Sequence, residues 1–216
     1  MNNKYTKNLE DVIKQMLRPL KNTPFNLVIE SISGNKVLRF DKNNSKDKFL
    51  LKNLIKVAKI ASNTINIKGL YALRTNEAGN AAELFVKKAL LKVGYKADTP
   101  LTKDKKKKST GYPDIEFTDQ FHRSNYLECK TYNIKNIATT QRSFYLSPSE
   151  NFKITKDAHH FLISFEIFST AKKNVYKCKS WKILSLDNLL VDIKYEFNSD
   201  NKRLYSKNSI LAEGKL

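Results

Sequence analysis

Two neighbouring segments in which apolar and polar residues alternate constrain the fold of this chain more than any other feature. They cover residues 111–118 and 125–132, and a short polar stretch, 119–124, separates them. Alternation with a period of two is typical of strands with one buried face, and a short polar connection suits an antiparallel pair. The pattern therefore predicts a β-hairpin that turns between Asp119 and Ser124.

Amphipathic helices are predicted on the N-terminal side of this hairpin. Apolar residues recur with the spacing of one helix face over residues 5–18, 46–61 and 76–93. Pro19 follows the first of these stretches and Gly94 follows the last, and both residues are typical at helix ends.

Further strands are predicted on both sides of the hairpin. Residues 25–33 and 36–40 favour two strands joined by a turn at Gly34-Asn35. After the hairpin, strands are predicted at 143–146, 160–168, 175–184 and 190–197, with a helical turn at 187–190. This order of elements favours an α/β or α+β fold, in which a mixed β-sheet is flanked by helices.

The chain carries a large excess of positive charge. It has 40 Lys and Arg against 21 Asp and Glu, which gives a formal net charge of +19. The codon bias of an AT-rich genome would explain part of the lysine excess, but it does not explain so few acidic residues. We therefore expect a polyanionic partner, above all a nucleic acid.

Several other protein classes are excluded by what the sequence lacks. Only two cysteines, Cys129 and Cys178, are present, too few for a disulfide scaffold or a Cys-rich zinc site. No apolar run approaches the length of a membrane span, so we expect a cytoplasmic protein without a membrane partner. No Gly-rich phosphate loop is present, which argues against ATP-driven activity.

The predicted hairpin would bring two carboxylates together. Asp114 would lie roughly opposite Glu128, and directly opposed residues share one face of a sheet. Lys130 follows two residues later on the same face. Two carboxylates suit a hard divalent cation, with the backbone carbonyl of Cys129 as a third oxygen ligand. Lys130 would then orient or help to deprotonate a water molecule, or stabilise charge on a phosphate.

A purely structural hairpin is the alternative interpretation. A solvent-facing hairpin shows the same alternation, but it has no need of Pro113 before Asp114. The opposite face would carry four apolar residues suited to a core, namely Ile115, Phe117, Leu127 and Cys129.

Pro113-Asp114 followed by Glu128-Cys129-Lys130 resembles the PD-(D/E)xK signature of the restriction endonuclease-like nuclease superfamily. The resemblance covers roughly residues 75–170. It implies a Mg²⁺-dependent phosphodiesterase that uses one or two ions, with Mn²⁺ able to substitute, and leaves 5′-phosphate and 3′-hydroxyl ends. Family members often carry an acidic residue on the preceding helix, and Glu83 is similar to it. A solvated helix carboxylate is the alternative for Glu83.

Basic and polar residues near the hairpin are candidates for DNA contacts. Lys105, Lys106, Lys107 and Lys108 directly precede the Pro-Asp strand and would hold phosphates, although a solvated charge run is the alternative. Gln141, Arg142 and Ser143, in the stretch that begins at Lys135, have side chains able to read base edges. Gln141 and Tyr145 also have the Gln-x-x-x-Tyr spacing of some recombination nucleases in this superfamily.

The resemblance implies a type II restriction endonuclease, since no helicase, ATPase or methyltransferase signature accompanies the nuclease motif. We expect a core over residues 71–216 and an N-terminal extension over residues 1–70, which would be a DNA arm or a dimer contact and not an independent domain. A homodimer would cut both strands of double-stranded DNA at a palindrome, and a separate methyltransferase would protect the host.

The sequence is also compatible with other functions. One subunit acting sequentially is the alternative to a dimer, and a junction resolvase-like repair nuclease is the alternative within the same class. A basic nucleic-acid-binding module without catalysis is the alternative from a different class. An RNA substrate also remains open, because its phosphate chemistry is similar.

Overall fold

The computed structural model describes most of the chain in two compact units. The described residues are 3–18, 20–73, 77–108, 110–140, 143–144, 146, 149–195, 198–206 and 208–212. One unit covers residues 24–190, and the other combines residues 1–23 with 191–216. The hairpin lies in the larger unit.

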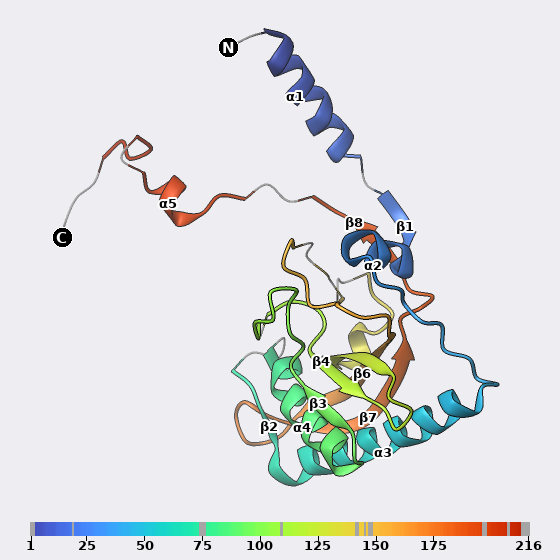
Figure 1. Ribbon diagram of the computed structural model, residues 1–216. Helices are drawn as coiled ribbons and strands as arrows, with labels where there is room; N and C mark the ends of the chain where they lie inside the picture. The colour runs from blue at the N-terminus through green and yellow to red at the C-terminus, as the bar shows by residue number, and fades with distance from the viewer. Residues whose placement is uncertain are drawn as a thin grey trace. The chain divides into compact units, whose positions relative to one another are not determined.

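The larger unit is built on a six-stranded sheet with the strand order β2-β7-β6-β5-β4-β3 (Figure 1). Its strands are β2 (Leu70–Tyr71), β3 (Lys96–Asp98), β4 (Ile115–Thr118), β5 (Ser124–Tyr132), β6 (His159–Ser169) and β7 (Val175–Ser185). β5 and β6 run parallel, and every other neighbouring pair in this sheet is antiparallel. The prediction of a mixed sheet flanked by helices is confirmed.

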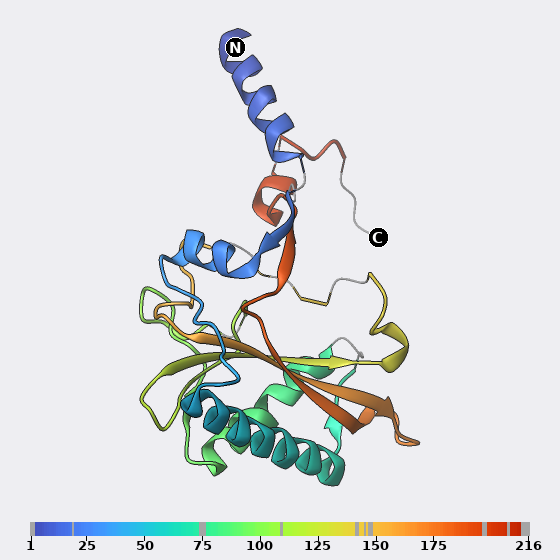
Figure 2. The same cartoon turned by 90° about the vertical axis from the view of Figure 1, so that its right-hand side faces the viewer.

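Two helices, α3 (Ser45–Lys68) and α4 (Ala78–Lys92), cover one face of this sheet (Figure 2). α3 begins at Asn44, whose side chain accepts hydrogen bonds from the N–H groups of Lys46 and Asp47, as N-cap residues do. Between the helices and the sheet lies the hydrophobic core, to which Leu54, Val86 and Leu127 contribute. The helix predicted at 46–61 is longer than expected and continues to Lys68. As predicted, the apolar face of the hairpin packs in the core.

Residues 25–33 form a helix, α2 (Phe25–Ser33), so the strand prediction for this segment was wrong. Its β-branched residues favour a strand by propensity, but Phe25 and Ile29 are four residues apart and both are fully buried. A strand would place Leu27 on the same face as these two residues, yet Leu27 is 54% exposed, whereas Val28 and Ile32 are half-buried, as the spacing of a helix requires. Gly34, which we predicted in a hairpin turn, ends the helix instead: it has a φ of 71° and donates its N–H to the Glu30 carbonyl.

Two further strand predictions were wrong, and a third was too long. Residues 36–40 form only a single bridge, between Val37 and Ala158. Two backbone hydrogen bonds make this bridge: the Leu38 N–H donates to the Ala158 carbonyl, and the Ala158 N–H donates to the Lys36 carbonyl. The described residues of 143–146 belong to no strand. The last predicted strand is shorter than expected, since β8 covers Leu190–Ile193.

The smaller unit contains α1 (Asn3–Met16), β1 (Leu20–Pro24), β8 and α5 (Asn201–Leu204), and β1 pairs with β8. The helix predicted at 5–18 is confirmed as α1, and apolar residues such as Leu9 and Val12 on it are about half exposed. Within the described parts of the chain, none of the helices combines the length and the apolar character that crossing a bilayer requires.

Candidate active site

The hairpin of β4 and β5 places Asp114 beside Glu128. Ile115 lies opposite Leu127 and Phe117 opposite Asn125, so the register continued by one residue puts Asp114 opposite Glu128. The Oδ2 atom of Asp114 also accepts a hydrogen bond of 2.8 Å from the backbone N–H of Cys129. The structure therefore brings together the two carboxylates that the sequence pattern selected.

The buried carboxylate of Glu128 is only partly satisfied by protein groups. The residue is 4% exposed, and its Oε1 atom lies 2.6 Å from Nζ of Lys130. Its Oε2 atom is buried and has no hydrogen-bond partner among the described residues. A buried acceptor without a partner is costly and uncommon, and a bound cation would satisfy it. These residues therefore fit a divalent metal ion.

Burial makes both carboxyl groups harder to ionise. Burial, together with the neighbouring charge of Asp114, raises the pKa of Glu128 to about 7, although the positive charge of Lys130 acts in the opposite direction. Burial likewise raises the pKa of Asp114, against the hydrogen bond from Cys129 and the positive charge of Lys130. Two buried carboxylates that oppose each other's ionisation are an arrangement that a divalent cation relieves.

The carbonyl of Cys129 lies next to this carboxylate pair. The register continued by two residues puts Pro113 opposite Cys129, and proline has no N–H to donate to that carbonyl. Gly79 of α4 adjoins the same oxygen, and a Cβ atom at Gly79 would lie 3.6 Å from it. Because Gly79 has no side chain, space remains beside the Cys129 oxygen. The carbonyl is thus suited to be the third oxygen ligand.

The structure does not join Glu83 directly to the carboxylate pair. The Oε1 atom of Glu83 lies 3.1 Å from Nζ of Lys87, one turn along α4. Its charge contributes to the raised pKa of Asp114, so it faces the same region. Within the described residues, however, no three His, Cys, Asp or Glu side chains gather closely enough to hold one metal ion. A direct metal contact by Glu83 would therefore require its side chain to move closer to the carboxylate pair.

Lys153 is a residue of this region that the sequence did not single out. It is 3% exposed, and its ammonium donates hydrogen bonds to the carbonyls of Gly111 and Pro113, just before Asp114. A single lysine in a lysine-rich chain carries no recognisable signal, and only the fold reveals that this one is buried.

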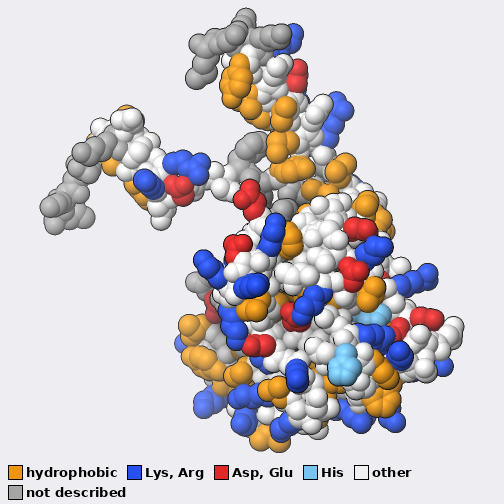
Figure 3. All heavy atoms as spheres, viewed as in Figure 1, with side chains coloured by type: hydrophobic (Ala, Val, Ile, Leu, Met, Phe, Trp, Pro, Cys, Tyr) orange, Lys and Arg blue, Asp and Glu red, His pale blue; other side chains and the backbone are white. Residues whose placement is uncertain are grey.

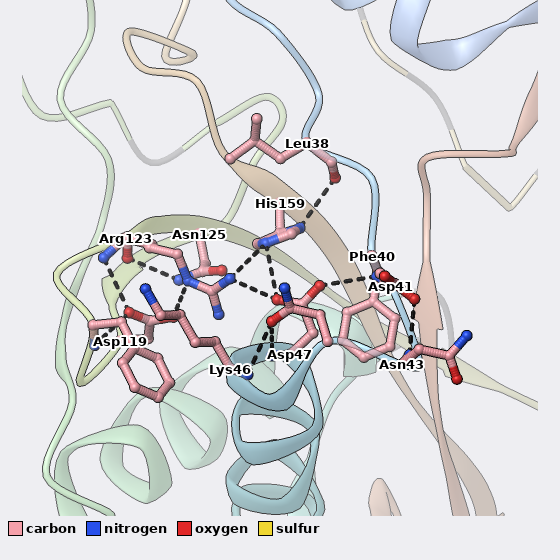
Figure 4. A network of polar contacts seen from close by, with 12 residues as sticks. Leu38, Phe40, Asp41, Asn43, Lys46, Asp47, Asp119, Arg123, Asn125 and His159 are labelled. Carbon is pink, nitrogen blue, oxygen red and sulfur yellow. Dashed lines mark hydrogen bonds and ion pairs between the residues drawn. The ribbon is translucent and has the colours of Figure 1, made fainter.

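A network of charged residues holds the hairpin turn in place (Figure 4). Arg123 lies between two carboxylates, with Nε 2.8 Å from Asp119 of the turn and Nη1 2.6 Å from Asp47 at the start of α3. Burial opposes ionisation of Asp47, but hydrogen bonds from Asp41 and Arg123 lower its pKa. His159 adjoins the network, and its Nδ1 atom lies 3.1 Å from the Leu38 carbonyl. This network fixes the turn and thereby supports the register that pairs Asp114 with Glu128.

The structure describes only some of the residues that were predicted to contact DNA. Lys105, Lys106, Lys107 and Lys108 are exposed, and Lys107 pairs with Asp98 at 2.6 Å. Lys135 and Ser143 are also exposed. Gln141, Arg142 and Tyr145 lie outside the described residues. On the face of the larger unit shown in Figure 3, Lys and Arg side chains are spread widely and do not form one patch.

A mixed sheet whose hairpin carries Pro-Asp opposite Glu-x-Lys is the arrangement of a restriction endonuclease-like fold. The chain belongs to the type II restriction enzyme MjaV family, whose model matches residues 19–208. It is 39% identical over 224 residues to the type II restriction enzyme MjaV of Methanocaldococcus jannaschii, an alignment that covers 97% of this chain and 96% of that protein. No solved structure matches the chain.

Proposed function

We propose that this chain is a type II restriction endonuclease that hydrolyses double-stranded DNA at a specific sequence. It would use a divalent metal ion, normally Mg²⁺ with Mn²⁺ able to substitute, and leave 5′-phosphate and 3′-hydroxyl ends. Family membership supports the activity. The observation that carries the mechanism is the buried carboxylate pair, Asp114 and Glu128, in which one oxygen atom has no partner among the described residues.

Each residue of the site has a distinct role in this mechanism. Asp114, Glu128 and the carbonyl of Cys129 would hold the metal ion, which when bound supplies Lewis acidity to the scissile phosphate. Lys130 lies next to Glu128 on the same face of β5, where its ammonium can orient a water molecule and stabilise charge on the phosphate. Glu83 would support a second ion.

The assembly around this core is also part of the proposal. A homodimer would present two sites to the two strands of a palindrome. A separately encoded methyltransferase would protect the host DNA, and the enzyme would act in the cytoplasm. The segment 1–70 would contribute a DNA arm or a dimer contact, while α3 within it packs in the same hydrophobic core as the sheet.

Digestion of a mixed plasmid and phage DNA substrate tests the proposed function directly. With Mg²⁺ we expect discrete bands, and with EDTA we expect none, because the carboxylate pair requires an ion to act on a phosphate. Sequencing of the ends would then identify the recognition site. Cutting of branched DNA alone would favour the junction resolvase-like alternative, and tight salt-sensitive binding without cleavage would favour a non-catalytic module.

The rate of cleavage is expected to fall as the pH falls below about 7. The pKa of Glu128 is raised to about 7, so protons compete with the metal ion for this carboxylate through that range. At low Mg²⁺, initial rates should drop roughly thirtyfold from about pH 8.5 to about pH 5.5, because only a few per cent of a carboxyl group with this pKa is ionised at the lower pH. Raising the Mg²⁺ concentration should move the midpoint to lower pH. A midpoint that does not respond to Mg²⁺ would contradict this assignment.

A further inference from the structure

Lys153 is a buried cation held by backbone carbonyls. Its Nζ atom lies 2.6 Å from the Gly111 oxygen and 2.9 Å from the Pro113 oxygen, and the residue is 3% exposed. An ammonium group removed from water is costly unless hydrogen bonds and opposite charges compensate it. Two of its three donors therefore bind the segment that immediately precedes Asp114.

The segment that carries Lys153 is itself anchored on both sides. The Phe152 carbonyl accepts a hydrogen bond from the Lys103 N–H, and the Ile154 carbonyl accepts one from the side chain of Asn35. Ile154 is 1% exposed. Lys153 consequently reaches the 111–113 segment from a fixed position and restrains where Asp114 can lie.

The charge of Lys153 also acts on the carboxylate pair. Its positive charge partly offsets the effect of burial on the pKa of both Asp114 and Glu128. Burial lowers the pKa of Lys153. The negative charges of Asp114, Glu128 and Glu83 act in the opposite direction and favour its ammonium form. The lysine therefore lies close enough to three acidic groups to interact with each.

We propose that Lys153 is a positioning residue of the active site, which holds the 111–113 segment so that Asp114 stays opposite Glu128 and the pair can bind a divalent ion. This inference rests on the proposed function. It assigns to Lys153 a role that differs from that of Lys130, because Lys153 bonds the backbone before Asp114 and Lys130 bonds the Glu128 carboxylate. The two lysines approach the carboxylate pair from different segments of the chain.

Metal binding without DNA tests this role. Lys153→Met removes the donors, and Lys153→Gln keeps a neutral donor. Lys156→Met is the matched control, since Lys156 follows three residues later and pairs at 2.7 Å with the Glu116 side chain. Calorimetric titration with Mn²⁺ at about pH 8 should show roughly tenfold weaker binding for Lys153→Met, a smaller loss for Lys153→Gln and no change for the control. Single-turnover cleavage should fall about a hundredfold in Lys153→Met, with DNA affinity kept.

The direction of the change in metal affinity decides the outcome. Loss of a positive charge alone would tighten Mn²⁺ binding, so tighter or unchanged binding in folded Lys153→Met would overturn the proposal. If that variant fails to fold, the same criterion applies to Lys153→Gln. Wild-type protein that binds Mn²⁺ but cuts no DNA would refute only the proposed function, whereas wild-type protein that binds no divalent ion would overturn both.

Discussion

Replacing Asp114 by Asn is expected to lower the rate of DNA cleavage by roughly a thousandfold while the protein stays folded. The amide oxygen of Asn can still accept the 2.8 Å hydrogen bond from the Cys129 N–H, so the local backbone is kept. What is lost is one of the two negative charges that hold the metal ion. Single-turnover cleavage with saturating Mg²⁺ and thermal unfolding in EDTA measure the two effects separately.

Asp98→Asn is a suitable control for this experiment. Asp98 is an exposed carboxylate on β3 that pairs with Lys107 at 2.6 Å, and it lies outside the proposed site. A surface ion pair of this kind contributes at most about 1 kcal/mol, so cleavage should stay within about twofold of the wild-type rate.

DNA binding in EDTA should be kept or tightened by Asp114→Asn, because a negative charge near the phosphate is removed. Retention of more than about a tenth of the wild-type rate would contradict the assigned role.

The pairing of Asp114 with Glu128 was predictable because one local pattern determines it. Alternation selects the buried face of each strand, and a shift of one residue would turn Ile115 and Phe117 away from the core. The polar stretch that begins at Asp119 then limits where the chain can turn. The register of the hairpin, and with it the position of both carboxylates, follows from residues within a window of about twenty positions.

The parts that sequence reasoning missed depend on contacts between distant segments. The helix at residues 25–33 buries Phe25 against Tyr112 and His160, which lie far along the chain. Strand propensity was the stronger local signal, and the tertiary contacts overrode it. The burial of Lys153 against residues 111–113 is likewise a product of the fold. Local periodicity carries no information about either contact.

The site combines groups that destabilise the protein in the absence of a metal ion. Glu128 has a buried oxygen without a partner in the described structure, and its pKa is raised to about 7. A carboxyl group with a raised pKa contributes stability that is fully present below its unfolded pKa and is lost as the pH rises through its folded pKa. At about pH 8 the ionised pair therefore lowers the free energy of unfolding, and a bound divalent ion should restore it.

Glu128→Gln is accordingly expected to lower the cleavage rate strongly and yet to stabilise the metal-free protein. Removal of the buried charge should raise the free energy of unfolding at about pH 8 in EDTA by on the order of 1 kcal/mol, after the weakened contact with Lys130 is allowed for. This corresponds to a rise of about 2–4 °C in the melting temperature. The cleavage rate should fall roughly a thousandfold, and added Mg²⁺ should raise the melting temperature of the wild type alone.

Glu116→Gln is the control for Glu128→Gln. It tests whether the loss of any carboxylate from the hairpin changes stability and cleavage in the same way. Glu116 lies on β4 and pairs at its surface with Lys156, so its replacement should lower stability slightly and leave cleavage intact. The stability gain of Glu128→Gln should also shrink as the pH falls towards the ordinary pKa of glutamate, 4.5, where the wild-type carboxyl group is itself neutral. A Glu128→Gln variant that melts below the wild type at about pH 8 in EDTA would show that the ionised carboxylate stabilises the fold. In that case Glu128 would be a structural partner of Lys130 and not a metal ligand held at a cost in stability.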